Sequence, residues 1–182
     1  TLIFSLADYV RTGVMTELQA TLIKTAVADR KNILIAGGTG SGKTTLANAV
    51  LNEISYISPD HRIVIIEDVL ELQCSVKNTV FLRTSSNIDQ VSLLRATLRL
   101  RPDRIVVGEV RDKSALALLK AWNTGHPGGI GTVHANSTGA ALVRIGQLIQ
   151  EAGVPAAPEL ISEAVNIVIS IKRHSTGRMI DE

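Results

Sequence analysis

The chain has 182 residues, of which 45% are hydrophobic but only 3% aromatic, so it can bury one core built largely from aliphatic side chains. Its 19 lysines and arginines nearly balance 17 acidic residues, and the formal net charge of +2 argues against a surface built to bind nucleic acid directly. A single cysteine, Cys74, excludes a disulfide within the chain and favours a reducing compartment such as the cytoplasm.

Two helices are predicted before the first strand. The segments 5–11 and 16–28 place apolar residues at helical spacing, and Thr16 suits the N-cap of the second helix. A short apolar strand at 32–36 and a helix at 45–54 follow, separated by a glycine-rich turn. Strand, turn and helix in this order form the setting that a phosphate-binding loop requires.

The glycine-rich turn, GGTGSGKT at 37–44, fits the spacing of a phosphate-binding loop. Its glycines allow backbone amides to converge on a phosphate, and the helix that follows directs its positive dipole end at the same anion. Lys43 adds a full charge against the outer phosphates, and Thr44 offers a hydroxyl oxygen to Mg²⁺. We therefore expect a nucleoside triphosphate to be bound by Gly38, Thr39, Gly40, Ser41, Gly42, Lys43, Thr44 and Thr45.

The next predicted strand, 62–67, ends in acidic residues. Glu67 and Asp68 follow its apolar run, and Glu71 comes shortly after them. Ligands of an open parallel sheet collect at the carboxyl ends of its strands, so we expect one of these acids to orient or deprotonate an attacking water. Taken alone, the pattern fits solvated turn residues equally well.

A strand at 79–83 and a helix at 88–100 lead to another apolar strand that ends in an acid, at 104–109. Many phosphate-loop enzymes place an aspartate where this chain has Gly108, so Glu109 is expected to hold Mg²⁺ and its waters alone. The alternative interpretation is a surface glutamate that merely ends a buried strand.

The segment 124–137 follows a predicted helix at 113–122 and contains a short strand near 130–133. His126 and His134 flank its glycines, and zinc is a poor explanation because no cysteine or third histidine stands near them. We expect the two histidines to sense the terminal phosphate of a bound nucleotide, although a single histidine in such a loop is more often structural.

The last predicted elements are a helix near 138–151, a helix at 158–165 and a strand at 166–172. Strands that alternate with helices along the chain predict an α/β fold, in which a mostly parallel sheet carries helices on both faces.

Four segments resemble, in order, the motifs of the bacterial type II and type IV secretion traffic ATPases, and most closely those of the TrbB-type conjugal transfer ATPases. They look like the Walker A motif, the Asp box, an atypical Walker B motif and the His box, and they read GGTGSGKTT at 37–45, IIEDVLELQ at 65–73, LRLRPDRIVVGEVRD at 98–112 and TGHPGGIGTVHANS at 124–137. The resemblance implies a RecA-like P-loop NTPase domain, and the Gly-Glu ending of the Walker B match is itself a feature of the family.

The resemblance also implies ATP and Mg²⁺ as cofactors and assigns roles to single residues. Glu67 is the implied general base, with Asp68 and Glu71 kept as candidates, and Thr44 and Glu109 are the implied Mg²⁺ ligands. The implied catalytic set is Lys43, Glu67, Glu109, His126 and His134.

Members of the family resemble one another in forming homohexameric rings with ATP at the subunit borders, where arginines stabilise the charge of the transition state. Six arginines lie near the matched acids in the sequence: Arg83, Arg95, Arg99, Arg101, Arg104 and Arg111. We expect Arg83 or Arg101 to contact phosphate, and we expect several of the others to be solvated helix charges or members of structural ion pairs.

Family members carry a separate N-terminal domain, whereas this chain has little room before its phosphate loop. Residues 1–12 are expected to be the remnant of a linker, and residues 13–182 the RecA-like ATPase domain. Because Thr1 is not an initiator methionine, we expect an excised fragment or a processed chain.

The implied function is Mg²⁺-dependent ATP hydrolysis by a hexamer that powers a type IV secretion or conjugal DNA transfer apparatus. Such a protein would lie in the cytoplasm, peripheral to the inner membrane, with membrane-embedded secretion components as partners. Pilus retraction and type II secretion ATPases share all four motifs and stay open as alternatives. A GTP-binding switch is disfavoured because the sequence lacks an Asn-Lys-x-Asp motif, and a RecA-like DNA motor is disfavoured by the near-neutral charge.

Overall fold

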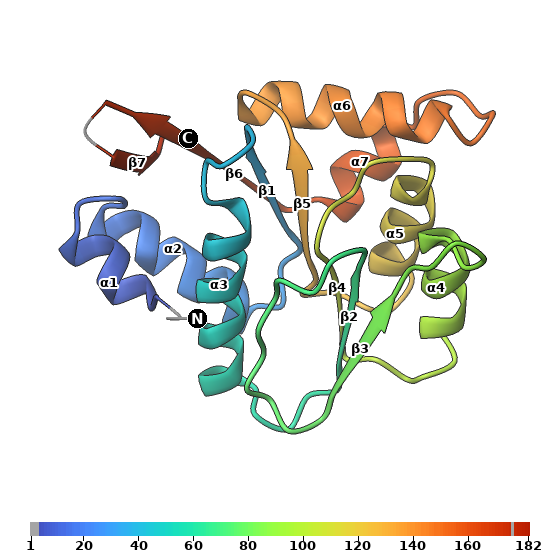
Figure 1. Ribbon diagram of the computed structural model, residues 1–182, viewed down its shortest axis with the longest axis horizontal. Coiled ribbons are helices and arrows are strands. Elements are labelled where there is room, and N and C mark those ends of the chain that lie inside the picture. The colour runs from blue at the N-terminus through green and yellow to red at the C-terminus, as the bar shows by residue number, and fades with distance from the viewer. Residues whose placement is uncertain (1–3, 176) are drawn as a thin grey trace.

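The structure is a computed structural model that describes residues 4–175 and 177–182, so the first three residues of the expected linker lie outside the described part. Helices and strands alternate along most of the chain (Figure 1). In chain order the elements are α1 (Leu6–Arg11), α2 (Glu17–Ala28), β1 (Ile33–Gly37), α3 (Lys43–Ile57), β2 (Ile63–Glu67), β3 (Thr79–Arg83), α4 (Gln90–Thr97), β4 (Arg104–Val107), α5 (Ser114–Asn123), β5 (Ile130–His134), α6 (Thr138–Gln150), α7 (Pro158–Ala164), β6 (Ile167–His174) and β7 (Gly177–Ile180).

The described strands form one sheet in the order β3-β2-β4-β5-β1-β6-β7. Neighbours from β3 to β6 pair in parallel, whereas β6 and β7 pair antiparallel. Every residue of β1, β2 and β4 is buried, as expected of parallel strands covered on both faces. The predicted α/β fold with a mostly parallel sheet is therefore confirmed.

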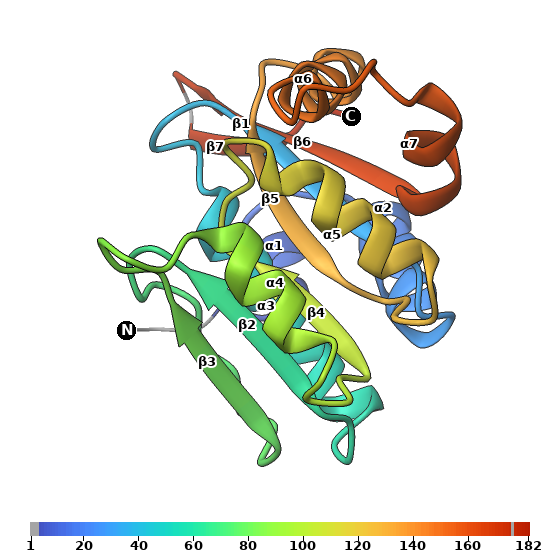
Figure 2. The same ribbon diagram turned by 90° about the vertical axis from the view of Figure 1, so that its right-hand side faces the viewer.

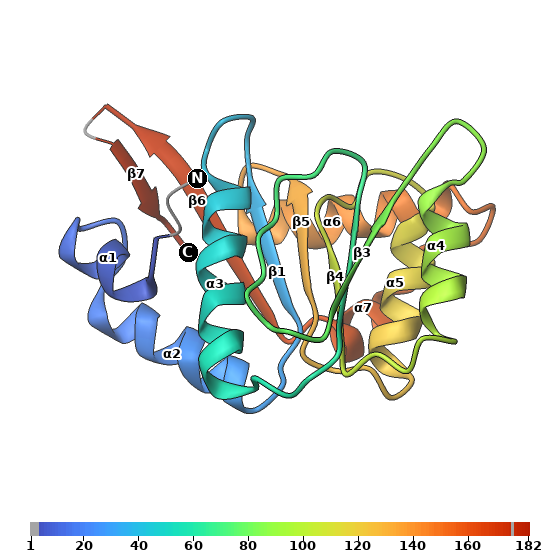
Figure 3. The same ribbon diagram turned by 60° about the horizontal axis from the view of Figure 1, so that its bottom comes forward.

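Helices cover both faces of the sheet, and each face has its own aliphatic core. Helices α1, α2 and α3 pack on one face and α4 to α7 on the other, as Figures 2 and 3 show. Because successive side chains of a strand point to opposite faces, Ile33 and Ile35 of β1 join the first core, while Leu34 and Ala36 join the second. None of the described helices is long and apolar enough to cross a membrane.

The first two helices begin where their capping residues predict. Ser5 and Asp8 form a capping box at α1, and Thr16 forms one with Gln19 at α2, so the predicted N-cap at Thr16 is confirmed. Leu6 and Tyr9 of α1 are 1% and 7% exposed, which makes this helix part of the folded core. That residues 1–12 also connect to another domain stays a prediction.

Several element boundaries differ from the predicted ones, and β4 and β6 among them end at Val107 and His174 rather than at 109 and 172. Helix α3 spans Lys43–Ile57 rather than 45–54, and it begins directly after Gly42, its left-handed N-cap, whose carbonyl accepts the first helical hydrogen bond from Leu46. Helix α4 is shorter than predicted, since Asp89 caps it and it ends at Thr97. Strand β7 has no counterpart among the predicted strands, because its four residues, GRMI, are too few to show an apolar pattern and its pairing with β6 is a tertiary contact.

Arg104 is a structural residue at the amino-terminal edge of the sheet. Its side chain is buried, and its guanidinium donates hydrogen bonds to the carbonyl oxygens of Val27 at 2.9 Å and Gly128 at 3.0 Å and to Nδ1 of His61 at 3.2 Å. Burial lowers the pKa of Arg104 to about 10, so the group stays charged at neutral pH. One side chain thus ties the end of α2 to β4 and to the loop before β5.

We predict that Arg104→Ala lowers the free energy of unfolding by about 3 kcal/mol, because two buried carbonyl groups lose their donor. Urea denaturation followed by the fluorescence of Trp122, which is 2% exposed, measures the loss. The control is Arg99→Ala, which removes an exposed arginine near the same edge and should change the value by no more than about 0.5 kcal/mol. Equal effects of the two changes would contradict the structural role of Arg104.

Candidate active site

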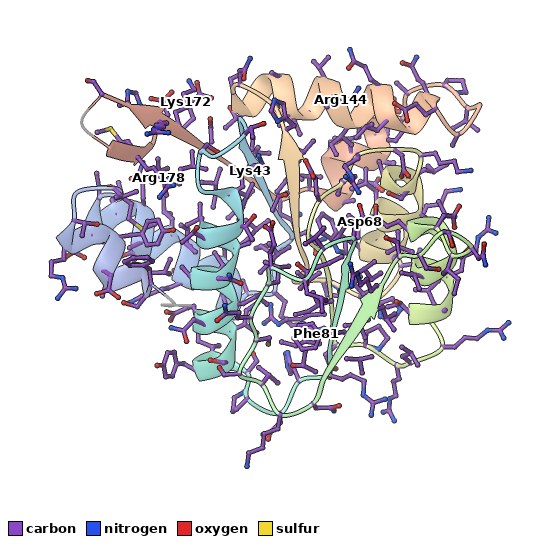
Figure 4. All side chains as sticks on the ribbon, in the orientation of Figure 1. Lys43, Asp68, Phe81, Arg144, Lys172 and Arg178 are labelled. Carbon is purple, nitrogen blue, oxygen red and sulfur yellow. The ribbon has the colours of Figure 1, made fainter. Side chains whose placement is uncertain are left out.

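A cavity of about 260 Å³ lies at the carboxyl-terminal edge of the sheet, where β1, β2, β4 and β5 end. Lys43 and Asp68 lie toward this edge in Figure 4. The cavity is lined by Thr39, Gly40, Lys43 and Thr44 after β1, by Glu67, Asp68, Val69 and Glu71 at and after the end of β2, by Gly108, Glu109 and Arg111 after β4, and by Thr132 and His134 of β5. Segments from four strands thus meet around one space, although the sequence separates them by up to about a hundred residues.

The loop between β1 and α3 has the backbone of an anion-binding turn. Gly40 and Gly42 have positive φ angles of 69° and 103°, which side chains disfavour. No side chain caps α3 at Gly42, and the first amides of a helix have no partner within it. These amides and the positive end of the helix dipole therefore suit a phosphate at the cavity.

Lys43 is held at the same loop. Its Nζ donates hydrogen bonds to the carbonyl oxygens of Gly37 at 2.8 Å and Gly38 at 3.0 Å. Partial burial lowers the pKa of Lys43, while the carboxylate of Glu109 acts in the opposite direction. The ammonium group is therefore placed between the loop and an acid of the cavity, where phosphate oxygens can replace the carbonyl groups as its partners.

Of the remaining residues of the predicted loop, Ser41 is buried behind it, and two threonines line a second cavity beside it. Ser41 is 4% exposed, and its hydroxyl has no hydrogen-bond partner within the described residues. A Cβ atom at Gly37 would lie 2.3 Å from that hydroxyl oxygen, so the strand must end in glycine. Thr44 and Thr45 also face a neighbouring cavity of about 340 Å³, which gives a ligand held at the loop room to extend.

Glu67 is an unusual buried acid. Its side chain is 3% exposed, and its Oε1 accepts hydrogen bonds from the backbone amides of Glu71 at 3.1 Å and Leu72 at 2.9 Å. Its Oε2 has no hydrogen-bond partner in the described part of the chain. A buried carboxylate oxygen without a donor is costly, so this atom suits a bound water or another donor in the cavity.

Gly108 leaves the space that Glu67 occupies. A Cβ atom at Gly108 would lie 2.9 Å from Cγ of Glu67 and 3.3 Å from its Oε1. The absence of an aspartate at this position, expected from the sequence to leave Glu109 alone, thus has a steric cause. Glu109 lines the cavity, and its backbone carbonyl accepts a hydrogen bond from Gln90 at 3.1 Å.

Among the candidate arginines, the structure brings Arg111 to the cavity. Arg111 forms an ion pair with Oδ2 of Asp68, and Oδ1 of Asp68 accepts a hydrogen bond from Thr84 at 2.5 Å. Arg83 lies nearby and donates to the backbone carbonyl of Asp68 at 2.9 Å, but it does not line the cavity. The sequence analysis named Arg111 among six candidate arginines but favoured Arg83 or Arg101, although the place of Arg111 two residues after Glu109 was a usable signal.

Arg101 is not part of this site. It lies before β4, at the opposite edge of the sheet, with a φ angle of 52° and an exposed side chain. Arg101 therefore does not line this cavity, and the expectation that it contacts phosphate stays a prediction. The reason is topological, because a parallel strand carries the residues before it and after it to opposite edges of the sheet.

The two predicted histidines are separated in the same way. His134 ends β5, pairs in register with Gly37 and lines the cavity. His126 precedes β5, and its Nδ1 lies 3.1 Å from the carbonyl oxygen of Pro102, which precedes β4. The length of β5, about 13 Å, separates the two ends. His126 therefore does not line this cavity, and its expected role at the terminal phosphate stays a prediction.

Whether Mg²⁺ suits this cavity depends on its donors. Among the described residues no three His, Cys, Asp or Glu side chains are grouped to hold a metal ion. Mg²⁺ in nucleotide sites takes most of its ligands from phosphate and water and few from the protein. Thr44, Glu109 and the unpaired Oε2 of Glu67 provide oxygen atoms for such an ion and its waters, so the residues fit it.

Residues 3–175 match the model of the family described as type II/IV secretion system protein. The chain belongs to this family. The probable conjugal transfer protein TrbB of Sinorhizobium fredii is 57% identical over 175 residues, which cover 96% of this chain and 54% of that protein. The type IV secretion system protein VirB11 of Bartonella henselae is 40% identical over 160 residues, which cover 81% of this chain and 44% of that protein. The chain thus spans about half the length of the curated relatives that it matches.

Solved structures of the same family share the fold. The VirB11 ATPase from the Brucella suis type IV secretion system, solved with sulphate, has a TM-score of 0.85 at 30% identity and covers 97% of this chain and 53% of its own. The pilus retraction motor PilT, solved with ADP, has a TM-score of 0.68 at 29% identity and covers 88% of this chain and 48% of its own. These similarities confirm the predicted RecA-like α/β fold.

The contact between Gly108 and Glu67 generates a prediction for stability. Gly108→Ala should lower the free energy of unfolding by about 2 kcal/mol, because the new methyl group overlaps Glu67. In a Glu67→Ala background the same change should cost at least about 1 kcal/mol less, because the overlapping atoms are gone. Urea denaturation of the four proteins measures this coupling.

The control for this cycle is Gly139→Ala, since no atom lies within 4 Å of a Cβ placed there. It should leave the free energy of unfolding unchanged or slightly raise it in both backgrounds, because alanine favours a helix. Additive effects of Gly108→Ala and Glu67→Ala would contradict the steric explanation.

Proposed function

We propose that this chain is the catalytic domain of a Mg²⁺-dependent ATPase, which works as a homohexamer to power a type IV secretion or conjugal DNA transfer apparatus. The observation that carries the catalytic part is the unpaired, buried Oε2 of Glu67, placed in the same cavity as Lys43 and the start of α3. A buried acid with one free oxygen beside a phosphate-binding loop suits a residue that orients or deprotonates the water in hydrolysis of a phosphoanhydride.

In the proposed reaction, the loop amides and Lys43 hold the phosphates at the start of α3. Thr44 and Glu109 would hold Mg²⁺ and its waters, and the ion when bound would supply positive charge against the outer phosphates. Glu67 accepts the proton of a water whose oxygen bonds to the terminal phosphorus, while the bond from that phosphorus to the bridging oxygen breaks and ADP leaves. His134 stands at the exposed end of β5, where it can contact the terminal phosphate.

The choice of ATP over GTP has two supports. The sequence contains no Asn-Lys-x-Asp motif for reading guanine. The similar solved structures are those of a VirB11 ATPase and of a PilT motor with bound ADP. Adenine nucleotide is therefore the proposed substrate of the cavity.

The choice of conjugation over related machines depends on sequence similarity. The TrbB protein of Sinorhizobium fredii is 57% identical to this chain, whereas PilT is 29% identical. Pilus retraction is the second candidate because the PilT fold covers 88% of the chain. We propose membrane-embedded secretion components as partners, with the protein peripheral to the inner membrane on its cytoplasmic side, and no direct contact with nucleic acid.

Three substitutions test the proposed chemistry by phosphate release from ATP with Mg²⁺. Lys43→Ala and Glu67→Gln should each lower the rate by roughly 100-fold or more, because a phosphate contact or the proton acceptor is removed. Glu109→Gln should raise the Mg²⁺ concentration needed for half-maximal rate, because an anionic oxygen is lost. Mass measured with and without nucleotide tests whether a hexamer forms.

The matched control is Lys24→Ala, which removes an exposed lysine of α2 and should leave the rate unchanged. Glu67→Gln should also bind ATP as tightly as the parent, which separates a catalytic role from a folding defect. Hydrolysis at the parent rate by Lys43→Ala would refute the proposed function.

A further inference from the structure

We propose that Arg111 distinguishes ATP from ADP by exchanging its ion pair with Asp68 for the terminal phosphate of ATP. This inference rests on the proposed function, because it assumes that the cavity binds an adenine nucleotide. The expected phosphate contact is thus assigned to Arg111 and not to Arg83 or Arg101, which the sequence favoured. The four observations that carry it are the position of Arg111, its anchored backbone, its exchangeable partner and the charge balance of the cavity.

Arg111 is positioned to reach a phosphate held at the loop. Of the arginines in the described residues, it is the one that lines the cavity together with Lys43 and Thr44. Its guanidinium presents several N–H donors in one plane, a geometry that matches two oxygens of a phosphate group. A phosphate beside Lys43 therefore lies in a cavity that Arg111 also lines.

The backbone around Arg111 is anchored, so the side chain is the part that can move. The amide of Val110 donates to the carbonyl oxygen of Thr132 at 2.8 Å, and Val110 is 2% exposed. Asp112 accepts a hydrogen bond from the amide of Ser114 at 2.7 Å, at the start of α5. Arg111 thus stands between two fixed residues, and its side chain can change partner without a change of fold.

The ion pair with Asp68 is one that a phosphate can replace. The side chains of Arg111 and Asp68 are 55% and 28% exposed, and ion pairs that water reaches contribute little free energy. Asp68 keeps other contacts when Arg111 leaves, because Thr84 donates to its Oδ1 and Arg83 to its backbone carbonyl. Departure of Arg111 therefore leaves no buried charge without a partner.

The charge of the cavity favours this exchange for ATP rather than ADP. Its lining contains four carboxylates, Glu67, Asp68, Glu71 and Glu109, against the two cations Lys43 and Arg111. A terminal phosphate adds negative charge to this acidic surrounding, so a second cation beside Lys43 gains a strong contact there. ADP lacks that group, so Arg111 keeps its pair with Asp68.

The test is equilibrium binding, with Mg²⁺, of ADP and of an ATP analogue whose β,γ-bridge is an imido group, which avoids hydrolysis during the measurement. Arg111→Ala should weaken binding of the analogue about ten-fold, the loss of one charge-assisted contact, and change binding of ADP less than two-fold. Arg111→Lys should recover part of the loss, since it keeps the charge without the planar fork. Asp68→Asn should tighten binding of the analogue, because the competing carboxylate is gone.

The matched control is Arg144→Ala, which removes a partly exposed arginine of α6 that does not line the cavity and should change neither affinity (Figure 4). The inference would be overturned if Arg111→Ala lost affinity equally for both nucleotides or lost none. The pair with Asp68 would then be a structural contact only. Nucleotide binding by Lys43→Ala distinguishes failure of this inference from failure of the proposed function. If Lys43→Ala binds both nucleotides as tightly as the parent, or if the parent binds neither, the proposed function itself is wrong.

Discussion

Parallel pairing of β2, β4, β5 and β1 is the constraint on which the site depends. Because these strands run in the same direction and adjoin in this order, the residues that follow them meet at one edge of the sheet. The pairing depends in turn on strands buried on both faces, which explains why the core is almost entirely aliphatic. The opposite edge is closed by polar contacts such as those of Arg104, which contribute to stability and not to the site.

Two of the four buried side-chain atoms that lack a hydrogen-bond partner among the described residues lie at the site. Oε2 of Glu67 and the hydroxyl of Ser41 are both buried beside the phosphate-binding loop. Such atoms lower stability, and the aliphatic packing on both faces of the sheet offsets that cost. Buried oxygen atoms without partners lower the stability of the fold, but they suit a cavity that binds water and phosphate.

The local chemistry of the site therefore depends on contacts between strands that are distant in the sequence. Gly108 is explained by Glu67 of the neighbouring strand, which fills the space that a side chain would need. Asp68 connects the segment after β2 to Arg111 after β4. A comparison restricted to one motif at a time would treat Gly108 as a missing ligand and Arg111 as one more surface arginine.

The sequence alone determined the local parts of this protein. Apolar runs and helical spacing located most elements, and Thr16 marked the start of α2. The glycines before Lys43 predicted a loop whose backbone takes positive φ angles. The sequence also indicated Glu67 and Glu109 as candidate site residues, because they lie at or shortly after the ends of buried strands. These features depend on residues close in the chain, where backbone preferences and side-chain period are enough.

Only the tertiary structure decided which of these residues share a site. It placed His134 at the cavity and His126 at the other edge, selected Arg111 rather than Arg83 or Arg101, and added β7 beside β6. The physical reason is that such contacts depend on the order and direction of strands. Strand order is set by packing across the whole sheet, and no pattern within a short segment of the chain carries it.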